Sequence, residues 1–303
     1  MSASAAAAAR PTKTQAWKLA ARVPTLTAAV APVVVGIALA IRDDVFDLGP
    51  ALAALLGALA LQVGANFAND VFDFKKGADT ADRLGPPRAT QMGLLSARQM
   101  LVGMWVAFGF AFLLGIYLVA VAGWPVVAIG LSSIAAAIIY TGGPWPIGYH
   151  ALGDAFTFIF FGLVATAGTY YVQSEELTKL AVAAAIPVGC TVTLILVVNN
   201  LRDIPTDRQA GKTTLGVVLG DKGTRGWYLS LLAAAYVVAL GCWVVGPLDW
   251  PVLLVLLSLA GAVVPVKAIT GGVAGRALNP ILKATARFHL LFAIAWSTGI
   301  LAS

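Results

Sequence analysis

The 303-residue sequence predicts an all-helical integral membrane protein whose chain crosses the membrane nine times. Hydrophobic residues make up 59% of the chain and charged residues only 11%, about half the charged share of a soluble domain. Nine apolar stretches have the length that a helix needs to cross the hydrocarbon core. They lack the alternating pattern of barrel strands, so helix is the expected form of each.

The expected elements occupy almost the whole chain. Residues 1–20 are Ala-rich and then basic, without a convincing signal-peptide cleavage site, and we expect a flexible cytoplasmic N-terminus there. Residues 21–303 are expected to form a single transmembrane domain. The nine expected spans cover residues 23–41, 50–70, 99–122, 124–141, 152–172, 179–200, 226–246, 250–269 and 281–301.

The distribution of Lys and Arg predicts the orientation of these spans. With the N-terminus placed in the cytoplasm, 18 of the 20 Lys and Arg residues fall on the cytoplasmic side, and only Arg42 and Lys179 fall on the other. This bias is the positive-inside pattern of membrane proteins. It accounts for the net charge of +6 without a nucleic-acid partner. We therefore expect a multi-pass protein of the cell membrane.

The first of two acidic motifs closes the second expected span. It reads Asn66-Phe-Ala-Asn69-Asp70-Val-Phe-Asp73. Positions three or four apart share one face of a helix, so Asn66, Asp70 and Asp73 are expected to line one face. The loop that follows carries more acids and then bases, namely Asp79, Asp82, Arg83 and Arg88.

The second acidic motif closes the sixth expected span and repeats the Asn-x-x-x-Asp spacing. Asn199 and Asp203 are expected on one face, together with Asp207 unless Pro205 breaks the helix early. Basic residues flank this motif as well, at Arg202, Arg208 and Lys212.

Both motifs indicate a magnesium site for a diphosphate. Carboxylates at a helix end that faces a membrane cavity repel one another unless a cation joins them. Magnesium takes one or two carboxylates and completes its coordination with water and substrate phosphate. Ordinary charged loops are the alternative, but two motifs with one spacing on one side of the membrane favour the metal site.

At these residues the sequence resembles the UbiA superfamily of intramembrane prenyltransferases, and within it the 1,4-dihydroxy-2-naphthoate polyprenyltransferase branch. The resemblance covers nearly the whole chain. The pattern Asn-Asp-x-x-Asp-x-x-x-Gly-x-Asp, with Asp-Arg-x-Gly-Pro downstream, is more typical of the naphthoate branch than of the hydroxybenzoate branch. The segments that carry the resemblance are 66–88, 140–144 (YTGGP), 162–173 (GLVATAGTYYVQ) and 199–220, which ends in GKTTLGVVLG.

The resemblance implies a nine-helix bundle around a central cavity that opens sideways to lipid and is capped by two cytoplasmic loops. It also implies magnesium as the cofactor, with two ions. The implied metal ligands are Asp70, Asp73, Asp203 and Asp207. Asn66 would assist them, and Arg22, Arg83 or Arg88, and Lys212 would contact the diphosphate. Asn199, Arg202 and Asp154 are further candidate substrate-binding residues. The family pattern Arg-Pro-x-Thr-Leu stands here as Arg-Val-Pro-Thr-Leu at 22–26, with the proline one position later.

The implied reaction transfers a polyprenyl group from a polyprenyl diphosphate to 1,4-dihydroxy-2-naphthoate, with loss of CO2 and diphosphate, giving demethylmenaquinone in menaquinone biosynthesis. Its allylic fragment is cation-like and suits aromatic faces. The aromatic candidates are Tyr140, Tyr149, Phe156, Phe160 and Tyr170, of which Tyr140 is singled out as catalytic because it opens the YTGGP segment. The partner of the acceptor carboxylate stays open among His150, Arg202, Arg287 and His289. Asp154 is either a helix N-cap or an acceptor-binding or proton-handling group.

Other functions fit parts of the pattern. Within the superfamily the acceptor could instead be 4-hydroxybenzoate, homogentisate or a tetrapyrrole, or the reaction a phosphoribosyl transfer to a polyprenyl phosphate. A cation-coupled transporter would also carry intramembrane acids. Here the acids gather at one membrane face and the spans are otherwise almost free of charge, which favours the enzyme. A structural scaffold would not need paired acidic motifs.

Overall fold

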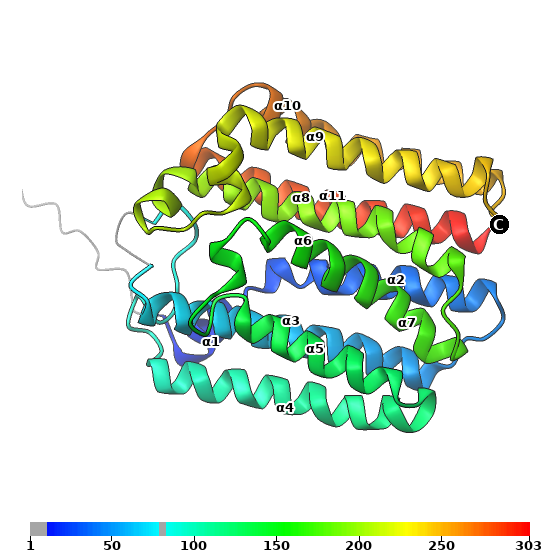
Figure 1. Cartoon of the computed structure of the whole chain (residues 1–303), viewed down its shortest axis with the longest axis horizontal. Coiled ribbons are helices and arrows are strands. Elements are labelled where there is room, and N and C mark those ends of the chain that lie inside the picture. The colour runs from blue at the N-terminus through cyan, green and yellow to red at the C-terminus, as the bar shows by residue number, and fades with distance from the viewer. Residues whose placement is uncertain (1–10, 79–82) are drawn as a thin grey trace, which may run out of the picture.

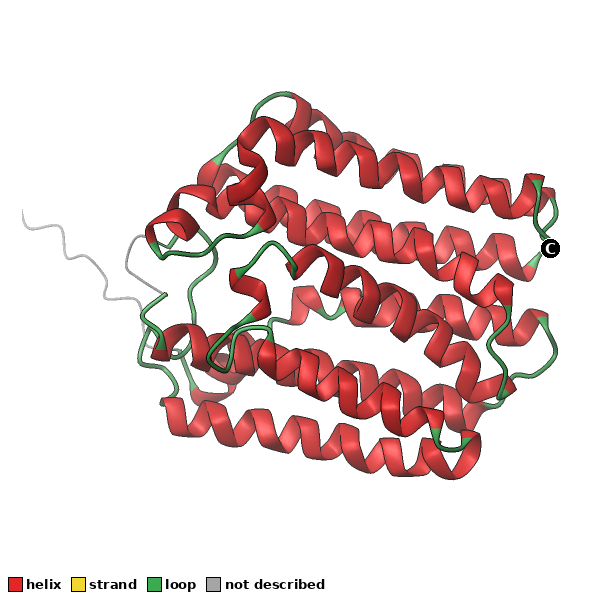
Figure 2. Cartoon of the chain, viewed as in Figure 1, coloured by secondary structure: helices red, strands yellow, loops and turns green. Residues whose placement is uncertain are grey.

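The computed structural model describes residues 11–78 and 83–303, in which every regular element is a helix. The long helices lie side by side along the long axis of the molecule (Figures 1 and 2). Seven segments of the described chain are long and apolar enough to cross a membrane. They are α3 (Leu48–Lys75), α4 (Ala97–Ala122), α6–η3–α7 (Gly153–Ser174), α8 (Lys179–Gln209), α9 (Leu215–Val244), η4–α10 (Trp250–Thr270) and η5–α11 (Gly275–Leu301).

Two further apolar segments lie beside these seven. The first combines α1 (Lys13–Ala21) and η1 (Val23–Thr25) with α2 (Thr27–Arg42) across a bend of 49°. The second is α5 (Pro125–Ile139), which has only 15 residues. Each stretch expected from the sequence falls on one of these segments or on one of the seven. The all-helical prediction is confirmed.

Three of the spanning segments are composite. The segment Gly153–Ser174 begins as α6 (Gly153–Thr157), passes through a π-helical stretch η3 (Phe158–Val164) and ends as α7 (Ala165–Ser174). The others are η4 (Trp250–Ser258) with α10 (Leu259–Thr270), and η5 (Gly275–Ala277) with α11 (Leu278–Leu301). A short η2 (Ile147–Tyr149) lies in the connection after α5. π-Helical turns occur often at functional sites, and η3 lines the cavity described below.

The first helix differs from the flexibility expected for residues 1–20. Residues 1–10 lie outside the described part of the chain, but α1 is a regular helix that opens with a capping box. The Trp17 ring packs edge-on against Phe67 of α3, with ring centroids 5.4 Å apart. The cap and this apolar contact order a segment whose composition alone predicted flexibility.

Helix α8 also runs further than the proline in it suggested. Pro205 does not break the helix, which continues to Gln209. A proline removes one backbone hydrogen bond, and membrane helices tolerate it where neighbouring groups satisfy the freed backbone atoms. Asp203 and Asp207 therefore stand on consecutive turns of one unbroken helix.

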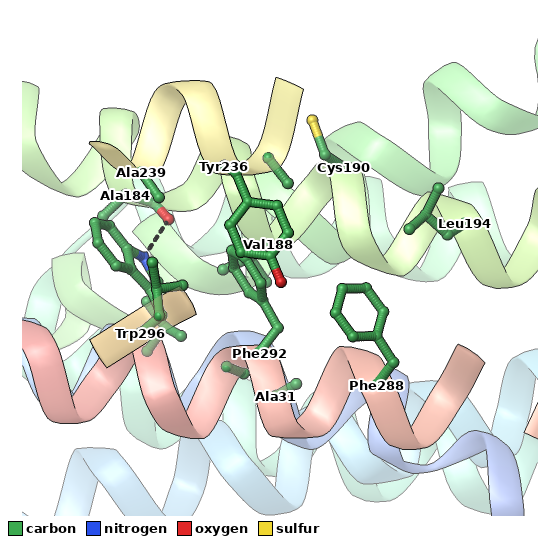
Figure 3. Packing of buried hydrophobic residues seen from close by; sticks show 14 of the residues in the cluster. Ala31, Ala184, Val188, Cys190, Leu194, Tyr236, Ala239, Phe288, Phe292 and Trp296 are labelled. Carbon is green, nitrogen blue, oxygen red and sulfur yellow. Dashed lines mark hydrogen bonds between the residues drawn. The ribbon is translucent and has the colours of Figure 1, made fainter. Parts of the chain in front are cut away.

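The main hydrophobic core lies between α2, α8, α9 and α11. In Figure 3, Phe288, Phe292 and Trp296 of α11 face α8 and α9, and the Trp296 indole donates to the Ala184 carbonyl at 3.2 Å. A second core joins α1, α3 and α4. Helices η3 and α8 approach so closely that a Cβ on Gly162 would lie 2.3 Å from the Gly189 Cα. This packing fixes the frame around the cavity.

Candidate functional site: a cavity with one charged end

A cavity of about 1410 Å³ lies inside the bundle, lined by α1–η1, α2, α3, α4, α5, η3–α7, α8 and α11. Both acidic motifs face one end of it, which we call the motif end; the C-terminus lies at the opposite end of the molecule (Figure 1). Beyond the motif end the lining is mostly apolar. The apolar part includes Ala54, Phe112, Ile116, Ile129, Phe161 and Val164.

Asp73 is the central carboxylate of the first motif. Arg88 Nη2 donates to its Oδ2 at 2.9 Å, and both side chains are less than a tenth exposed. Its Oδ1 accepts from the Tyr149 hydroxyl at 2.8 Å and lies 3.5 Å from Lys212 Nζ. Asp73 lines the cavity. Its charge is thus compensated by groups from three separate segments of the chain.

Asp70 has a different environment, although it shares the motif. Its Oδ2 accepts from the Ala89 backbone N–H at 3.0 Å and its Oδ1 from the Thr90 N–H at 3.1 Å. The side chain is 1% exposed and does not line the cavity. Both oxygens therefore fasten the loop that follows Arg88, and neither faces the space in which a metal ion would lie.

The two asparagines of the first motif also divide their roles. Asn69 lines the cavity, and its Oδ1 accepts from the Thr141 hydroxyl at 3.0 Å. Asn66 also lines the cavity, but its amide nitrogen donates to the Ala21 carbonyl at 2.9 Å and to Thr25 Oγ1 at 3.0 Å. Asn66 thus ties α3 to the junction of α1 and α2.

Arg202 holds the second motif from behind. It is 1% exposed and donates to Asp203 through Nε at 2.7 Å and through Nη2 at 2.5 Å. Its Nη2 also reaches Asn199 Oδ1 at 2.5 Å, and its Nη1 donates to Asn279 Oδ1 at 2.9 Å. Asn279 in turn donates to the Leu84 carbonyl at 3.0 Å. Asp203, Asn199 and Asn279 line the cavity, whereas Arg202 itself does not.

Asp207 stands one turn after Asp203 and also lines the cavity. Its Oδ2 accepts from the Thr214 hydroxyl at 3.4 Å. Lys212 lies in the loop between Asp207 and Thr214, with its Nζ 4.3 Å from the centre of the Tyr149 ring. The Tyr149 carbonyl accepts from the Thr213 N–H at 2.8 Å. Tyr149 therefore connects the second motif to Asp73 of the first.

Arg22 has an unsatisfied hydrogen-bond donor at the motif end. It adopts a left-handed backbone conformation with φ of 50°, which is uncommon for a residue other than glycine and occurs often at functional sites. Its Nη2 is buried and donates to no other described residue. Arg22 lines the cavity close enough to Arg88 and Asp73 to feel both charges. A buried guanidinium with a free donor is what an anionic ligand would satisfy.

Tyr140 lines the cavity between the motif end and the apolar part. Phe156, Phe160 and Tyr149 line the cavity as well. Tyr170 does not, because its hydroxyl donates to Asp43 at 2.7 Å instead.

Asp154 is buried outside the cavity. Its Oδ1 accepts from Asn200 Nδ2 at 3.1 Å and its Oδ2 from the Trp227 indole at 2.9 Å. It stands inside the first turn of α6, whose N-cap is Leu152. This position does not match a capping role. Asp154 instead joins α6 to α8 and α9.

None of the four residues considered for the acceptor carboxylate lines the cavity. His289 is fully buried in the helix core and shares a 2.9 Å hydrogen bond with Thr191. His150 Nδ1 is bonded to the Pro146 carbonyl at 2.9 Å, and Arg287 is exposed. Arg202 holds Asp203, as described above. Asp79 and Asp82 of the first motif lie outside the described residues.

Three residues at the site were not assigned a role from the sequence. Asn69 is part of the first motif, but the sequence analysis assigned the metal-binding role to the charged residue Asp70 that follows it. Asn279 and Lys283 of α11 line the cavity four residues apart, but no acidic motif marks them in the sequence. Only the packing of α11 against α8 brings them to the second motif.

The donor set fits magnesium that is completed by a phosphate ligand. Within the described chain, no three His, Cys, Asp or Glu residues lie close enough to hold a metal ion by themselves. Asp73, Asp203 and Asp207 line one cavity together with the Asn69 amide. Magnesium uses few carboxylates and binds substrate phosphates, and the unsatisfied Arg22 donor provides a contact for the same anion.

Comparison with known proteins decides the family. The model of the UbiA prenyltransferase family matches residues 29–276. The chain belongs to the UbiA prenyltransferase family. The matched range contains both acidic motifs and most of the cavity-lining helices, so the UbiA assignment covers the site and not only the membrane helices.

Several relatives within the UbiA family are similar over nearly their whole length. The 1,4-dihydroxy-2-naphthoate octaprenyltransferase of Mycobacterium tuberculosis is 40% identical over 282 residues, which are 92% of this chain and 94% of that protein. The protein of the same name from Bacillus subtilis is 33% identical over 290 residues, or 95% and 92% of the two chains.

Solved structures of UbiA homologues have the same fold. One from Archaeoglobus fulgidus, bound to DMAPP and Mg2+, superposes with a TM-score of 0.70 at 13% identity, covering 94% of this chain and 99% of that one. Another, from Aeropyrum pernix, has a TM-score of 0.69 at 18% identity and covers 91% and 97%. At this identity the likeness establishes the UbiA fold.

Proposed function

We propose that this UbiA-family chain is a 1,4-dihydroxy-2-naphthoate polyprenyltransferase of menaquinone biosynthesis. The observation that carries the proposal is the cavity itself. Among the described residues it combines three carboxylates and an arginine with a buried, unsatisfied donor at one end with an apolar body, in a chain 40% identical to a relative that bears this name. Such a cavity suits a substrate with a charged head and a long hydrocarbon tail.

The reaction exchanges one bond for another. The bond between the allylic carbon and the diphosphate oxygen breaks, and a bond forms from that carbon to the naphthoate ring carbon that bears the carboxylate. The carboxylate then leaves as CO2, and its bonding electrons restore the aromatic ring. The products are diphosphate, CO2 and the prenylated naphthalenediol, which is the reduced form of demethylmenaquinone.

We propose that Asp73, Asp203, Asp207 and the Asn69 amide hold two magnesium ions with the diphosphate. When bound, magnesium supplies positive charge that stabilises the departing diphosphate. Arg22, Arg83, Arg88 and Lys212 line the same end of the cavity and would contact the diphosphate oxygens. Preorganised cations of this kind usually contribute a large part of catalysis.

Two motif residues take positioning roles in this proposal. Asp70 fastens the backbone at residues 89–90 and thereby places Arg88. Arg202 orients the Asp203 carboxylate and, through Asn279, the loop that carries Arg83. Neither residue lines the cavity. Both act through the groups that they hold.

The apolar body of the cavity accommodates the polyprenyl chain. Its lining on α3 extends from Asp73 to Ala54, a difference of 19 residues and therefore about 28 Å along the helix. An apolar lining excludes water from the allylic cation, which would otherwise be hydrolysed. Tyr140 and Phe160 present aromatic rings between the diphosphate end and the tail, where cation–π attraction contributes about 0.5–2 kcal/mol.

We propose that the nine apolar segments each cross the membrane, with the N-terminus and the motif end in the cytoplasm. The bent α1–α2 pair and the short α5 would then be spans beside the seven long ones. The support is the bias of Lys and Arg, since 18 of 20 fall on the side that holds both motifs. Cytoplasmic loops carry this excess in most multi-pass proteins.

Acceptor competition tests the proposed function. Purified protein in detergent would receive a long-chain prenyl diphosphate, magnesium and equal amounts of 1,4-dihydroxy-2-naphthoate and 4-hydroxybenzoate, with products identified by mass spectrometry. We expect prenylated naphthalenediol and no prenylated hydroxybenzoate. Product from hydroxybenzoate alone would retain the family and overturn the acceptor.

A further inference from the structure

Among the described residues, six Lys and Arg side chains line the cavity, and most of them lie at the diphosphate end. Arg88 and Lys212 pair with Asp73. Arg22 lies within reach of the same charges, and the Arg83 Nε donates to the Pro86 carbonyl in the adjoining loop. Lys18 is exposed in the last turn of α1. The sixth, Lys283, is exposed as well and belongs to none of these groups.

Lys283 lies on the cavity face of α11 and has no ion pair with any described residue. Asn279, four residues earlier, shares that face and is bonded to Arg202 and to the Leu84 carbonyl. Asn279 is therefore level with Asp203, which Arg202 also holds. Four residues further along α11, Lys283 stands about 6 Å deeper in the cavity.

Asn199 lies on the neighbouring helix and also lines the cavity. It precedes Asp203 by four residues on α8, which runs in the direction opposite to α11 (Figure 1), so its backbone lies about 6 Å deeper than that of Asp203. Its Oδ1 accepts from Arg202 Nη2 at 2.5 Å, which fixes the amide orientation because arginine only donates. Its Nδ2 donates to no described residue and points away from the arginine.

We infer that Lys283 and Asn199 form the subsite that binds the carboxylate of the aromatic acceptor. This inference rests on the proposed function, in which the acceptor is an anion that must enter beside the metal-bound diphosphate. An ammonium group and a free amide N–H on adjacent helices match the two oxygens of one carboxylate.

The subsite also distinguishes the acceptor from the product. The acceptor carboxylate pairs with Lys283 until CO2 leaves, and the prenylated product has no group for that contact. The ion pair between Lys283 and the acceptor carboxylate is therefore present before the reaction and absent after it. Product release toward the membrane would follow from the same step that completes the chemistry.

Substitution of Lys283 tests this subsite in the full-length protein. We expect Lys283→Gln to raise the KM for 1,4-dihydroxy-2-naphthoate at least tenfold, with the KM for the prenyl diphosphate unchanged. Lys283→Arg, which keeps the charge, should recover most of the affinity. Arg287→Gln is the matched control, because Arg287 is an exposed cation one turn further along α11 that does not line the cavity.

A decarboxylated analogue provides the second readout. We expect 1,4-naphthohydroquinone to inhibit the wild-type protein and Lys283→Gln equally, since it lacks the group that Lys283 binds. An unchanged acceptor KM in Lys283→Gln, or an equal rise in Arg287→Gln, would overturn the subsite while naphthoate transfer by the wild-type protein upheld the proposed function. Absence of naphthoate transfer by the wild-type protein would overturn both.

Discussion

Replacement of Asp70 by asparagine separates a loop anchor from a metal ligand. Asp70 accepts two backbone N–H groups and is 1% exposed. Asparagine offers one acceptor oxygen and one NH2 group, so one of the two N–H groups would face another donor. Leaving a buried N–H unsatisfied costs about 1–3 kcal/mol, and the remaining bond loses its charge assistance. We expect Asp70→Asn to lower the free energy of unfolding by about 2–4 kcal/mol.

The assay combines hydrogen exchange with magnesium titration. In Asp70→Asn the amides of Ala89 and Thr90 should exchange faster, while the magnesium concentration for half-maximal activity stays near the wild-type value. The matched variant Asp73→Asn should do the reverse, because Asp73 lines the cavity and bonds no backbone amide. A large rise in the magnesium requirement of Asp70→Asn, with unchanged exchange at Ala89 and Thr90, would refute the anchoring role.

Three further substitutions test other parts of the site. Asn279→Ala removes the link between Arg202 and the Leu84 carbonyl. Because a lost bond of this kind costs about 1–3 kcal/mol, the KM for prenyl diphosphate should rise about tenfold or more. An unchanged KM would contradict the link. Tyr149→Phe keeps the ring beside Lys212 but removes the hydrogen bond to Asp73. We expect kcat/KM at saturating magnesium to fall about tenfold. Wild-type kinetics would exclude a role of this hydrogen bond in catalysis. Gly57→Phe fills the apolar body of the cavity about 24 Å from Asp73, where an added Cβ meets no atom within 4 Å. Turnover of long-chain prenyl diphosphates should fall, while geranyl diphosphate should still be used. An equal loss for both substrates would contradict the placement of the prenyl tail in this part of the cavity.

The sequence predicted the helices and the charged end of the cavity because both follow from local patterns. Apolar runs of membrane-spanning length locate helices directly, and the two acidic motifs mark the segments that bring Asp73, Asp203 and Asp207 to the cavity. The sequence analysis did not predict α1, which depends on the capping box at Thr12 and on the Trp17–Phe67 contact with α3. Pro205 likewise signalled a break that the surrounding helix does not make.

The sequence could not tell which motif residues face the cavity and which hold other parts of the chain, because residues on one face of a helix can contact different neighbouring segments. Asp70 and Asp73 are both three or four residues from another motif residue, yet only the fold shows that the loop at 89–90 covers one of them. Arg202 was expected to bind substrate and instead lies behind Asp203. Lys283 reaches the cavity only through the packing of α11 against α8, which no motif records.

The stoichiometry of the products tests the central proposal most directly. Purified protein would receive a polyprenyl diphosphate and naphthoate labelled in the carboxyl group, and released CO2 and diphosphate would be counted together with and without magnesium. We predict that CO2, diphosphate and prenylated product appear in equal amounts, only with magnesium, and not in Asp73→Asn. Diphosphate release without CO2, or transfer that persists after magnesium is chelated, would contradict it.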